Sequence, residues 1–162
     1  MAENKVNERQ VNDETVNIVM GAVVARLQGL LDILELLDME ADMLLSKDAN
    51  PYIEARSKEG AVYFFSYIPV DINGLFILQV SREVTSEEID KETILINVAS
   101  FNIGSDFGFA VYDPVDDKAV LRAQVPEQGA ISLEWYSYIL KLFNDSYAEL
   151  EDALRIDDAE EV

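Results

Sequence analysis

Residues 61–84 read AVYFFSYIPV DINGLFILQV SREV, and this stretch decides the fold. β-Branched and aromatic residues dominate both 61–69 and 75–84, which is the composition of β-strands. Asn73-Gly74 lies between the two segments, and both residue types tolerate the positive φ that a two-residue hairpin turn requires. The stretch therefore predicts an antiparallel hairpin.

Alternation along this hairpin gives each face of the predicted sheet a set of apolar side chains. A two-residue turn at Asn73-Gly74 would place Tyr67 across from Val80 and Pro69 across from Leu78. One face then carries Tyr63, Phe65, Tyr67, Phe76, Leu78 and Val80. The opposite face carries Val62, Phe64, Ile68, Val70 and Ile77.

The strand before the hairpin, 52–56, favours the second of these faces as the core. It leads into the hairpin through a turn at Glu59-Gly60, and its Ile53 and Ala55 alternate with charged residues. The two hairpins therefore disagree about the buried face. Either the register is off by one residue, which would turn every side chain to the other face, or both faces are covered, which would indicate a partner or a second copy. On the second interpretation, the candidate interaction residues are Tyr63, Phe65 and Tyr67.

Three helices and a second hairpin complete the pattern. Apolar residues recur at three- and four-residue steps over 14–37, and a second helix is predicted over 86–103 with Ser86 as its N-cap. A hairpin follows over 107–125, and Ser132 caps the last helix. The order α-βββ-α-ββ-α predicts an α+β domain, with a twisted antiparallel sheet of about five strands flanked by helices.

The first helix carries a second line of residues beside its main apolar face. This line consists of Ile18, Ala22, Ala25, Gly29 and Ile33, with Gly21 next to it. Small residues at helical spacing allow another backbone to approach closely. Gly21, Ala25 and Gly29 therefore either pack on the sheet or form a helix–helix contact with a second copy.

The last helix has an unbroken apolar seam of about six turns. The seam consists of Leu133, Tyr136, Leu140, Phe143, Tyr147, Leu150 and Leu154. It predicts a helix packed along a sheet rather than a free coiled coil. Trp135 and Tyr138 lie off the seam. Either they contact another molecule, as aromatic residues at interfaces do, or the helix is buried on two sides.

The charge and the missing residue types narrow the function. The chain of 162 residues has 32 acidic and 12 basic residues, for a net charge of -20. Such a surface disfavours nucleic acid and anionic membranes. Cysteine and histidine are both absent, which removes disulfides, thiolate nucleophiles, His-based triads and Cys or His zinc sites. We therefore expect no enzymatic activity, no cofactor and no metal.

The remaining acidic clusters have structural explanations. Asp113, Asp116 and Asp117 surround Pro114 in a predicted turn, without the residue order of a calcium-binding loop. Nucleotide-binding glycine motifs and nucleophile-elbow motifs are absent from the sequence. A hairpin turn is the better interpretation of the aspartates.

One domain over 14–154 is expected, with an additional N-terminal helix over 14–30. We expect residues 1–13 to be a disordered N-terminus and 155–162 an acidic disordered tail. The first residues lack the apolar core of a signal peptide, and no run reaches the roughly 18 apolar residues of a membrane span. These features predict a cytoplasmic protein.

The order and spacing of four segments resemble the YbjN family of bacterial sensory-transduction regulators. The resemblance covers roughly residues 30–152, with Asn97 or Asn102 as counterpart of a family asparagine, and leaves 16–29 unexplained. The segments are Asp48–Ala55, Val62–Tyr67, the stretch from Ile96-Asn97 to Phe107–Asp113, and Gly129–Ser132. The resemblance implies a fold similar to class I type III secretion chaperones, which are small, acidic, commonly dimeric proteins that hold partner chains.

These observations predict a non-enzymatic, protein-binding domain of chaperone or adaptor type. It would form a homodimer and recognise a partner protein through an apolar sheet or groove. The alternative is a structural subunit that its N-terminal helix docks into a larger assembly. An acid-based or divalent-cation-dependent enzyme is the third and weakest hypothesis.

Overall fold

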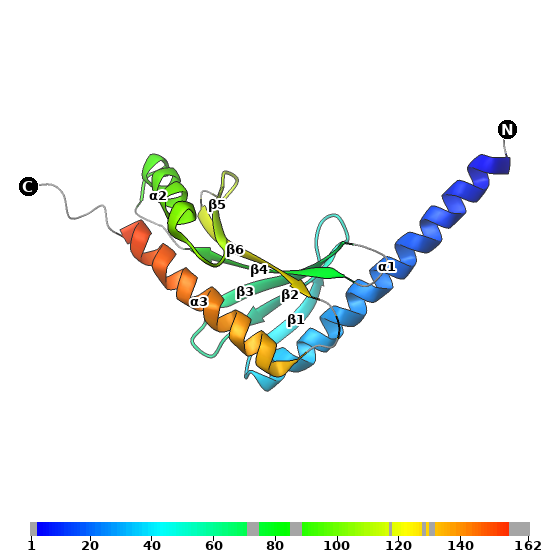
Figure 1. The fold of residues 1–162 in the computed structure, drawn as a ribbon, viewed down its shortest axis with the longest axis horizontal. Helices are drawn as coiled ribbons and strands as arrows, with labels where there is room; N and C mark the ends of the chain where they lie inside the picture. The colour runs from blue at the N-terminus through cyan, green and yellow to red at the C-terminus, as the bar shows by residue number, and fades with distance from the viewer. Residues whose placement is uncertain are drawn as a thin grey trace, which may run out of the picture.

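The computed structural model describes residues 3–70, 75–84, 89–116, 118–127, 129 and 132–155, and the side chains from Val16 onward. It is an α+β fold, as predicted, in which helices flank a single antiparallel sheet (Figure 1). The elements are α1 (Glu3–Leu36), β1 (Glu40–Leu45), β2 (Pro51–Arg56), β3 (Val62–Pro69), β4 (Phe76–Val84), α2 (Lys91–Gly104), β5 (Phe109–Asp113), β6 (Lys118–Glu127) and α3 (Leu133–Arg155).

The sheet has six strands in the order β1-β2-β3-β4-β6-β5, one more than expected. The additional strand is β1, an edge strand that follows α1 after a tight turn at Asp38, where φ is 60°. Its side chains Glu40 and Asp42 are acidic, and its Ala41 and Met43 pack against the core. A short, acidic edge strand of this kind has little strand signal in sequence.

The helices pack on one face of the sheet, and we call this the covered face. Alternate strand residues join the buried helix residues in one core cluster, and Figure 1 shows α1 and α3 meeting in a V below the sheet. The seam of α3 packs along this face as predicted, with Tyr136, Phe143 and Leu150 almost fully buried. The largest fully buried side chains are Tyr136, Phe65, Phe143, Leu27, Leu30, Leu34, Ile53, Leu78, Ile94, Leu121 and Leu150.

The first hairpin shows which of the two alternatives for the buried face is correct: the predicted register was off by one residue. Ala55 pairs with Tyr63 and Ile53 with Phe65, so all four side chains lie on the covered face. The connection is a three-residue loop rather than a two-residue turn at Glu59-Gly60, and Gly60 closes it at φ 87°. The additional loop residue shifts the register by one, which turns β2 over relative to the prediction.

The second hairpin differs from its prediction by two residues. Tyr67 pairs with Leu78 rather than with Val80, and Pro69 pairs with Phe76 rather than with Leu78. The backbone N–H of Val70 donates to the carbonyl of Leu75, so the loop between them has four residues, and Asn73-Gly74 lies outside the described residues. A two-residue shift leaves each side chain on its face, and the predicted facial sets are therefore correct.

Helix α1 is longer than the predicted 14–37 and begins at Glu3, within the segment expected to be disordered. Its 34 residues span about 50 Å. By length and composition, Val16–Leu36 is apolar enough to cross a membrane, contrary to the prediction that no run is. Leu27, Leu30 and Leu34 in its second half are fully buried in the core. Packing against the sheet therefore accounts for one side of this helix, whereas Val16, Ile18 and Val24 on its other side are exposed.

Of the N-caps predicted for the other two helices, the cap of α3 is correct and that of α2 is not. The carboxylate of Asp90 accepts the backbone N–H groups of Glu92 and Thr93, so α2 begins after Asp90 rather than at the predicted Ser86, which lies outside the described residues. Ser132 caps α3 as predicted, with its Oγ 3.4 Å from the backbone N of Trp135. The tail over 156–162 is not among the described residues.

Candidate functional site

The face of the sheet opposite the helices carries a set of partly exposed apolar side chains. We call it the uncovered face, because none of the described helices contributes to it. Ile68 is 40% exposed, and Tyr52 and Phe64 are half-buried with their ring centroids 6.4 Å apart. Its apolar residues are Leu44, Tyr52, Val62, Phe64, Ile68 and Ile77.

Acidic residues bound the uncovered face on the side of β1. Asp42 pairs directly with Glu54 across β1 and β2, and neither carboxylate has a cationic partner within the described residues. Like charges placed directly opposite in a sheet destabilise the pairing. This edge of the face therefore attracts a cation.

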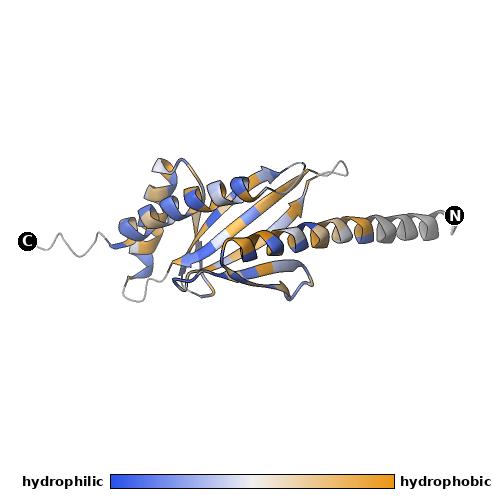
Figure 2. Cartoon of the chain, turned by 90° about the horizontal axis from the view of Figure 1, so that it is seen from below, coloured by the Kyte–Doolittle hydropathy of each residue, from blue (hydrophilic) through white to orange (hydrophobic). Residues whose placement is uncertain are grey.

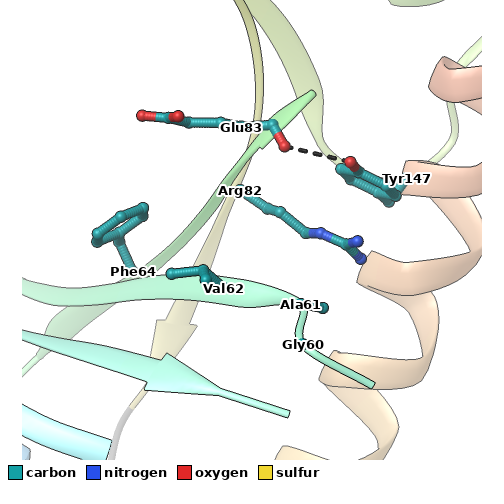
Figure 3. Close-up of a pocket in the computed structure, with 7 residues that line it drawn as sticks. All are labelled: Gly60, Ala61, Val62, Phe64, Arg82, Glu83 and Tyr147. Atoms are coloured by element: carbon teal, nitrogen blue, oxygen red, sulfur yellow. Dashed lines mark hydrogen bonds between the residues drawn. The ribbon is translucent and has the colours of Figure 1, made fainter. Parts of the chain in front are cut away.

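The sheet divides at one end of this face. β3 pairs with β4 from Pro69–Phe76 as far as Phe64–Ser81, whereas β4 continues alongside β6 to Val84–Ala119. A cavity of about 310 Å³ lies where β3 and β4 separate, and we call it the fork cavity (Figure 3). Its lining consists of Gly60, Ala61, Val62, Phe64, Arg82, Glu83 and Tyr147.

Two tyrosine rings hold Arg82 in the fork cavity. The guanidinium carbon lies 3.5 Å from the ring centroid of Tyr147 and 5.4 Å from that of Tyr63. The Tyr147 hydroxyl donates to the backbone carbonyl of Glu83 at 3.2 Å, as the dashed line in Figure 3 shows, and burial raises the pKa of Tyr147. The Glu83 carboxylate binds Lys118 at 2.8 Å instead of Arg82.

A buried polar cluster ties α1 and α3 to the covered face. The hydroxyls of Tyr67 and Tyr136 donate to Glu127 Oε2 at 2.8 and 2.7 Å, and they also contact each other. Arg26 of α1 donates to Glu127 Oε1 at 2.9 Å and lies over the ring of Phe76. Burial, together with the Glu127 carboxylate, raises the pKa of both tyrosines. This cluster links four elements, α1, β3, β6 and α3, and is largely buried.

The structure separates the sequence-predicted interaction residues into two groups. Tyr63, Phe65 and Tyr67 are at most 5% exposed on the covered face, so they belong to the core rather than to a binding surface. Trp135 also leans on the core, with its ring 4.8 Å from that of Tyr136. The remaining residues lie on the helices: Tyr138, Gly21 and Ala25 are exposed, and Gly29 is half-buried.

The outer side of α1 is exposed, apolar and nearly uncharged. Ile18 is 68% exposed, and a Cβ built on Gly21 would meet no atom within 4 Å. Arg26 is the single charged residue between 15 and 31, and Glu127 neutralises it. Figure 2 shows hydrophobic residues recurring along the described part of α1, including where it leaves the sheet.

The described residues contain no group of three or more carboxylates placed to hold a metal ion. Asp113 accepts the backbone N–H of Val115 at 2.9 Å, which is turn chemistry, and Asp117 is outside the described part of the chain. Sequence reasoning missed Arg82 and Glu127, because both act through residues distant in sequence.

Comparison with known proteins shows a similarity in fold to solved structures and no relative by sequence. No family model matches the chain, and no curated protein matches it. The fold is similar to the crystal structure of YbjN, a proposed transcription regulator from E. coli, with a TM-score of 0.50 and 14% sequence identity. The match covers 78% of this chain and 90% of YbjN. The expected relationship to YbjN is therefore confirmed at the level of the fold.

Proposed function

We propose that this protein is a non-enzymatic adaptor that binds another protein on the uncovered face of its sheet. The observation that carries the proposal is the contrast between the faces. Helices bury one face, whereas Tyr52, Phe64 and Ile68 on the other stay partly exposed in the monomer. Clustered apolar side chains on a sheet surface are typical of protein-binding sites. The fold is shared with YbjN, and distant membership of that family and a cytoplasmic, chaperone-like role are part of the same proposal.

The partner that fits this face is an apolar segment with a basic residue beside it. The apolar side chains would accept aliphatic or aromatic groups, and the unpaired Asp42 and Glu54 would accept the cation. The net charge of -20 accelerates encounter with a basic partner and repels acidic ones. The same charge disfavours nucleic acid and anionic membranes as partners.

A pair of matched variants tests the partner surface. Ile68→Lys places a cation on the uncovered face, and Ile103→Lys makes the same change on α2, where Ile103 is 89% exposed. In affinity capture from cells that express the protein natively, we expect one near-stoichiometric partner with wild type and Ile103→Lys, and its loss with Ile68→Lys. Retention of that partner by Ile68→Lys, or no partner with wild type, would contradict the proposal.

We further propose that two copies associate through the outer side of α1. Residues 1–31 carry four acidic and three basic side chains, whereas the rest of the chain carries 28 and nine. Association through any other surface would therefore bring two strongly acidic bodies together. An antiparallel pair of α1 helices crossing at Gly21 and Ala25 would bury Ile18 and hold the acidic bodies at opposite ends.

Light scattering after size-exclusion chromatography tests this contact. Wild type should have twice the chain mass of 18.2 kDa, and Ile18→Glu should be a monomer. The control is Val115→Glu, which adds the same charge at a residue that is 87% exposed in the β5–β6 turn, and it should stay dimeric. A monomeric wild type would contradict the homodimer. If Ile18→Glu then also lost a large native complex, the second candidate, a structural subunit docked through α1, would be favoured.

A further inference from the structure

The fork cavity holds a cation that no carboxylate among the described residues neutralises. Four of the basic side chains in the described residues form ion pairs: Arg26 with Glu127, Lys58 with Asp38, Lys118 with Glu83, and Arg155 with Glu151. In contrast, Arg82 has no carboxylate within 4.0 Å in this part of the chain, although the protein has 32 acidic residues. Lys47, Arg56, Lys91, Arg122 and Lys141 likewise form no ion pair within the described residues, so what sets Arg82 apart is its position between two tyrosine rings in the cavity.

The surroundings of Arg82 fix the orientation of its guanidinium and leave the donors available. The rings of Tyr147 and Tyr63 hold the group through cation–π contacts, which use its face and not its N–H edge. No protein acceptor within the described residues takes a hydrogen bond from Arg82, and none of its nitrogens is both buried and unsatisfied. The planar edge of a held guanidinium matches the two oxygens of a carboxylate.

The walls of the fork cavity define what the carboxylate would be attached to. Ala61, Val62, Phe64 and the ring of Tyr147 supply apolar surface around the single cation. A volume of about 310 Å³ is at the small end of ligand pockets, which suits one amino-acid residue or a small organic acid. Two acidic groups of the described residues near the cavity are paired with cations: Glu83 with Lys118, and Glu151 of the next turn of α3 with Arg155 at 3.7 Å.

We propose that the fork cavity is a binding site for a carboxylate borne on a small apolar or aromatic group, with Arg82 as the anion-binding residue. The carboxylate would accept two N–H bonds from Arg82, and its apolar group would lie against Ala61 and the ring of Tyr147. The carboxylate could belong to a free organic acid or to the carboxyl end of a peptide, because both offer the same group. Arg82 pairs with Leu121, so its side chain lies on the covered face, whereas Val62 and Phe64 of the lining belong to the uncovered face.

Nuclear magnetic resonance titration of the full chain tests the proposal. The probes are phenylacetate and the peptide N-acetyl-Gly-Gly-Phe with a free carboxyl end, and their neutral controls are phenylacetamide and the peptide amide. We expect saturable shifts of the Arg82 Nε–H and Tyr147 ring signals with at least one carboxylate and none with either amide. Binding of phenylacetate alone would indicate a free acid as the ligand, and binding of the peptide alone would indicate a chain end.

Two variants assign the binding to Arg82. Arg82→Gln should abolish the shifts, and Arg82→Lys, which keeps the charge without the planar fork, should weaken binding about tenfold. Arg122→Gln removes the same charge from the uncovered face and should bind as wild type does. The proposal is overturned if wild type shows no saturable shift with either carboxylate, if the amides bind equally well, or if inorganic phosphate binds and carboxylates do not. If Arg82→Gln does not fold, the titrations of Arg82→Lys and of wild type show whether the carboxylate binds through Arg82.

Discussion

Phe64 and Phe65 are neighbours in β3, but they have opposite environments. Phe65 is 1% exposed and packs with Ile53 and the helices, whereas Phe64 is half-buried on the uncovered face and contacts Tyr52. The same alternation continues in β4 with Leu78 and Ile77. Residue type alone therefore does not distinguish a core position from a binding position. The pairing register does, because it decides which residue of each adjacent pair faces the helices.

The largest expected effect comes from truncating each of the two phenylalanines in a separate variant. Phe65→Ala removes a buried ring and should lower the free energy of unfolding by about 3–5 kcal/mol. Phe64→Ala, whose ring keeps part of its solvent contact, should lower it by about 1 kcal/mol. Urea unfolding of both variants measures the difference, with Phe65→Leu as a milder variant if Phe65→Ala does not fold. Equal losses would show that both faces are covered.

Much of this contrast was predictable from sequence, and the failures have separable physical causes. The facial sets of β3 and β4 were predictable because alternation has a period of two, so the two-residue error in the second hairpin left them unchanged. Ile53 and Ala55 were assigned to the wrong face because one additional loop residue exchanges the two faces of the strand. Neither Lys58 nor Glu59 indicates from sequence that the loop has three residues instead of two. Strand β1 was missed because its acidic side chains mask its pattern.

The candidate sites were less predictable, because they depend on contacts between distant residues. Arg26 and Glu127 are 101 positions apart, and nothing local to either residue indicates the other. Arg82 lies within a strand with Val80 and Val84, and only the packing of α3 brings Tyr147 over its guanidinium. The small residues of α1 were visible in sequence. Their exposure depends on which side of the helix the sheet covers.

The polar cluster on the covered face predicts a loss of stability at alkaline pH. Burial raises the pKa of Tyr67 and Tyr136 in the folded protein above the ordinary value of 10.0, so the folded state keeps protons that the unfolded state releases. Stability is therefore complete below pH 10 and falls as the pH rises above it, by up to about 1.4 kcal/mol per pH unit for each tyrosine. Urea unfolding between pH 8 and pH 11 measures the slope. Tyr136→Phe should reduce that slope, and an unchanged slope would mean that the cluster is not its source.

A smaller effect is expected at the turn that aligns β2 with the covered face. Gly60 has a φ of 87°, a conformation that strains any residue with a Cβ, although a Cβ there would meet no atom within 4 Å. Gly60→Ala should therefore destabilise the fold by about 1 kcal/mol through backbone strain alone. Thermal unfolding measures the loss, and Gly104→Ala in α2, which has equal space and a helical backbone, should stabilise instead. A neutral Gly60→Ala would show that the loop does not require positive φ.

The smallest expected effect has the opposite sign and separates folding from binding. Asp42 and Glu54 lie opposite each other on the uncovered face, so Asp42→Lys replaces a repulsive pair with an attractive one and should stabilise the fold by about 0.2–1 kcal/mol. The same change removes a group proposed to attract the basic partner, and affinity for that partner should fall. Asp106→Lys, in the segment between α2 and β5, gives the same charge change away from the face and should leave affinity unaltered. If Asp42 served only the fold, Asp42→Lys would change stability and leave affinity for the partner unaltered. Measuring unfolding and binding of the same variant therefore distinguishes a structural role of Asp42 from a role in partner binding.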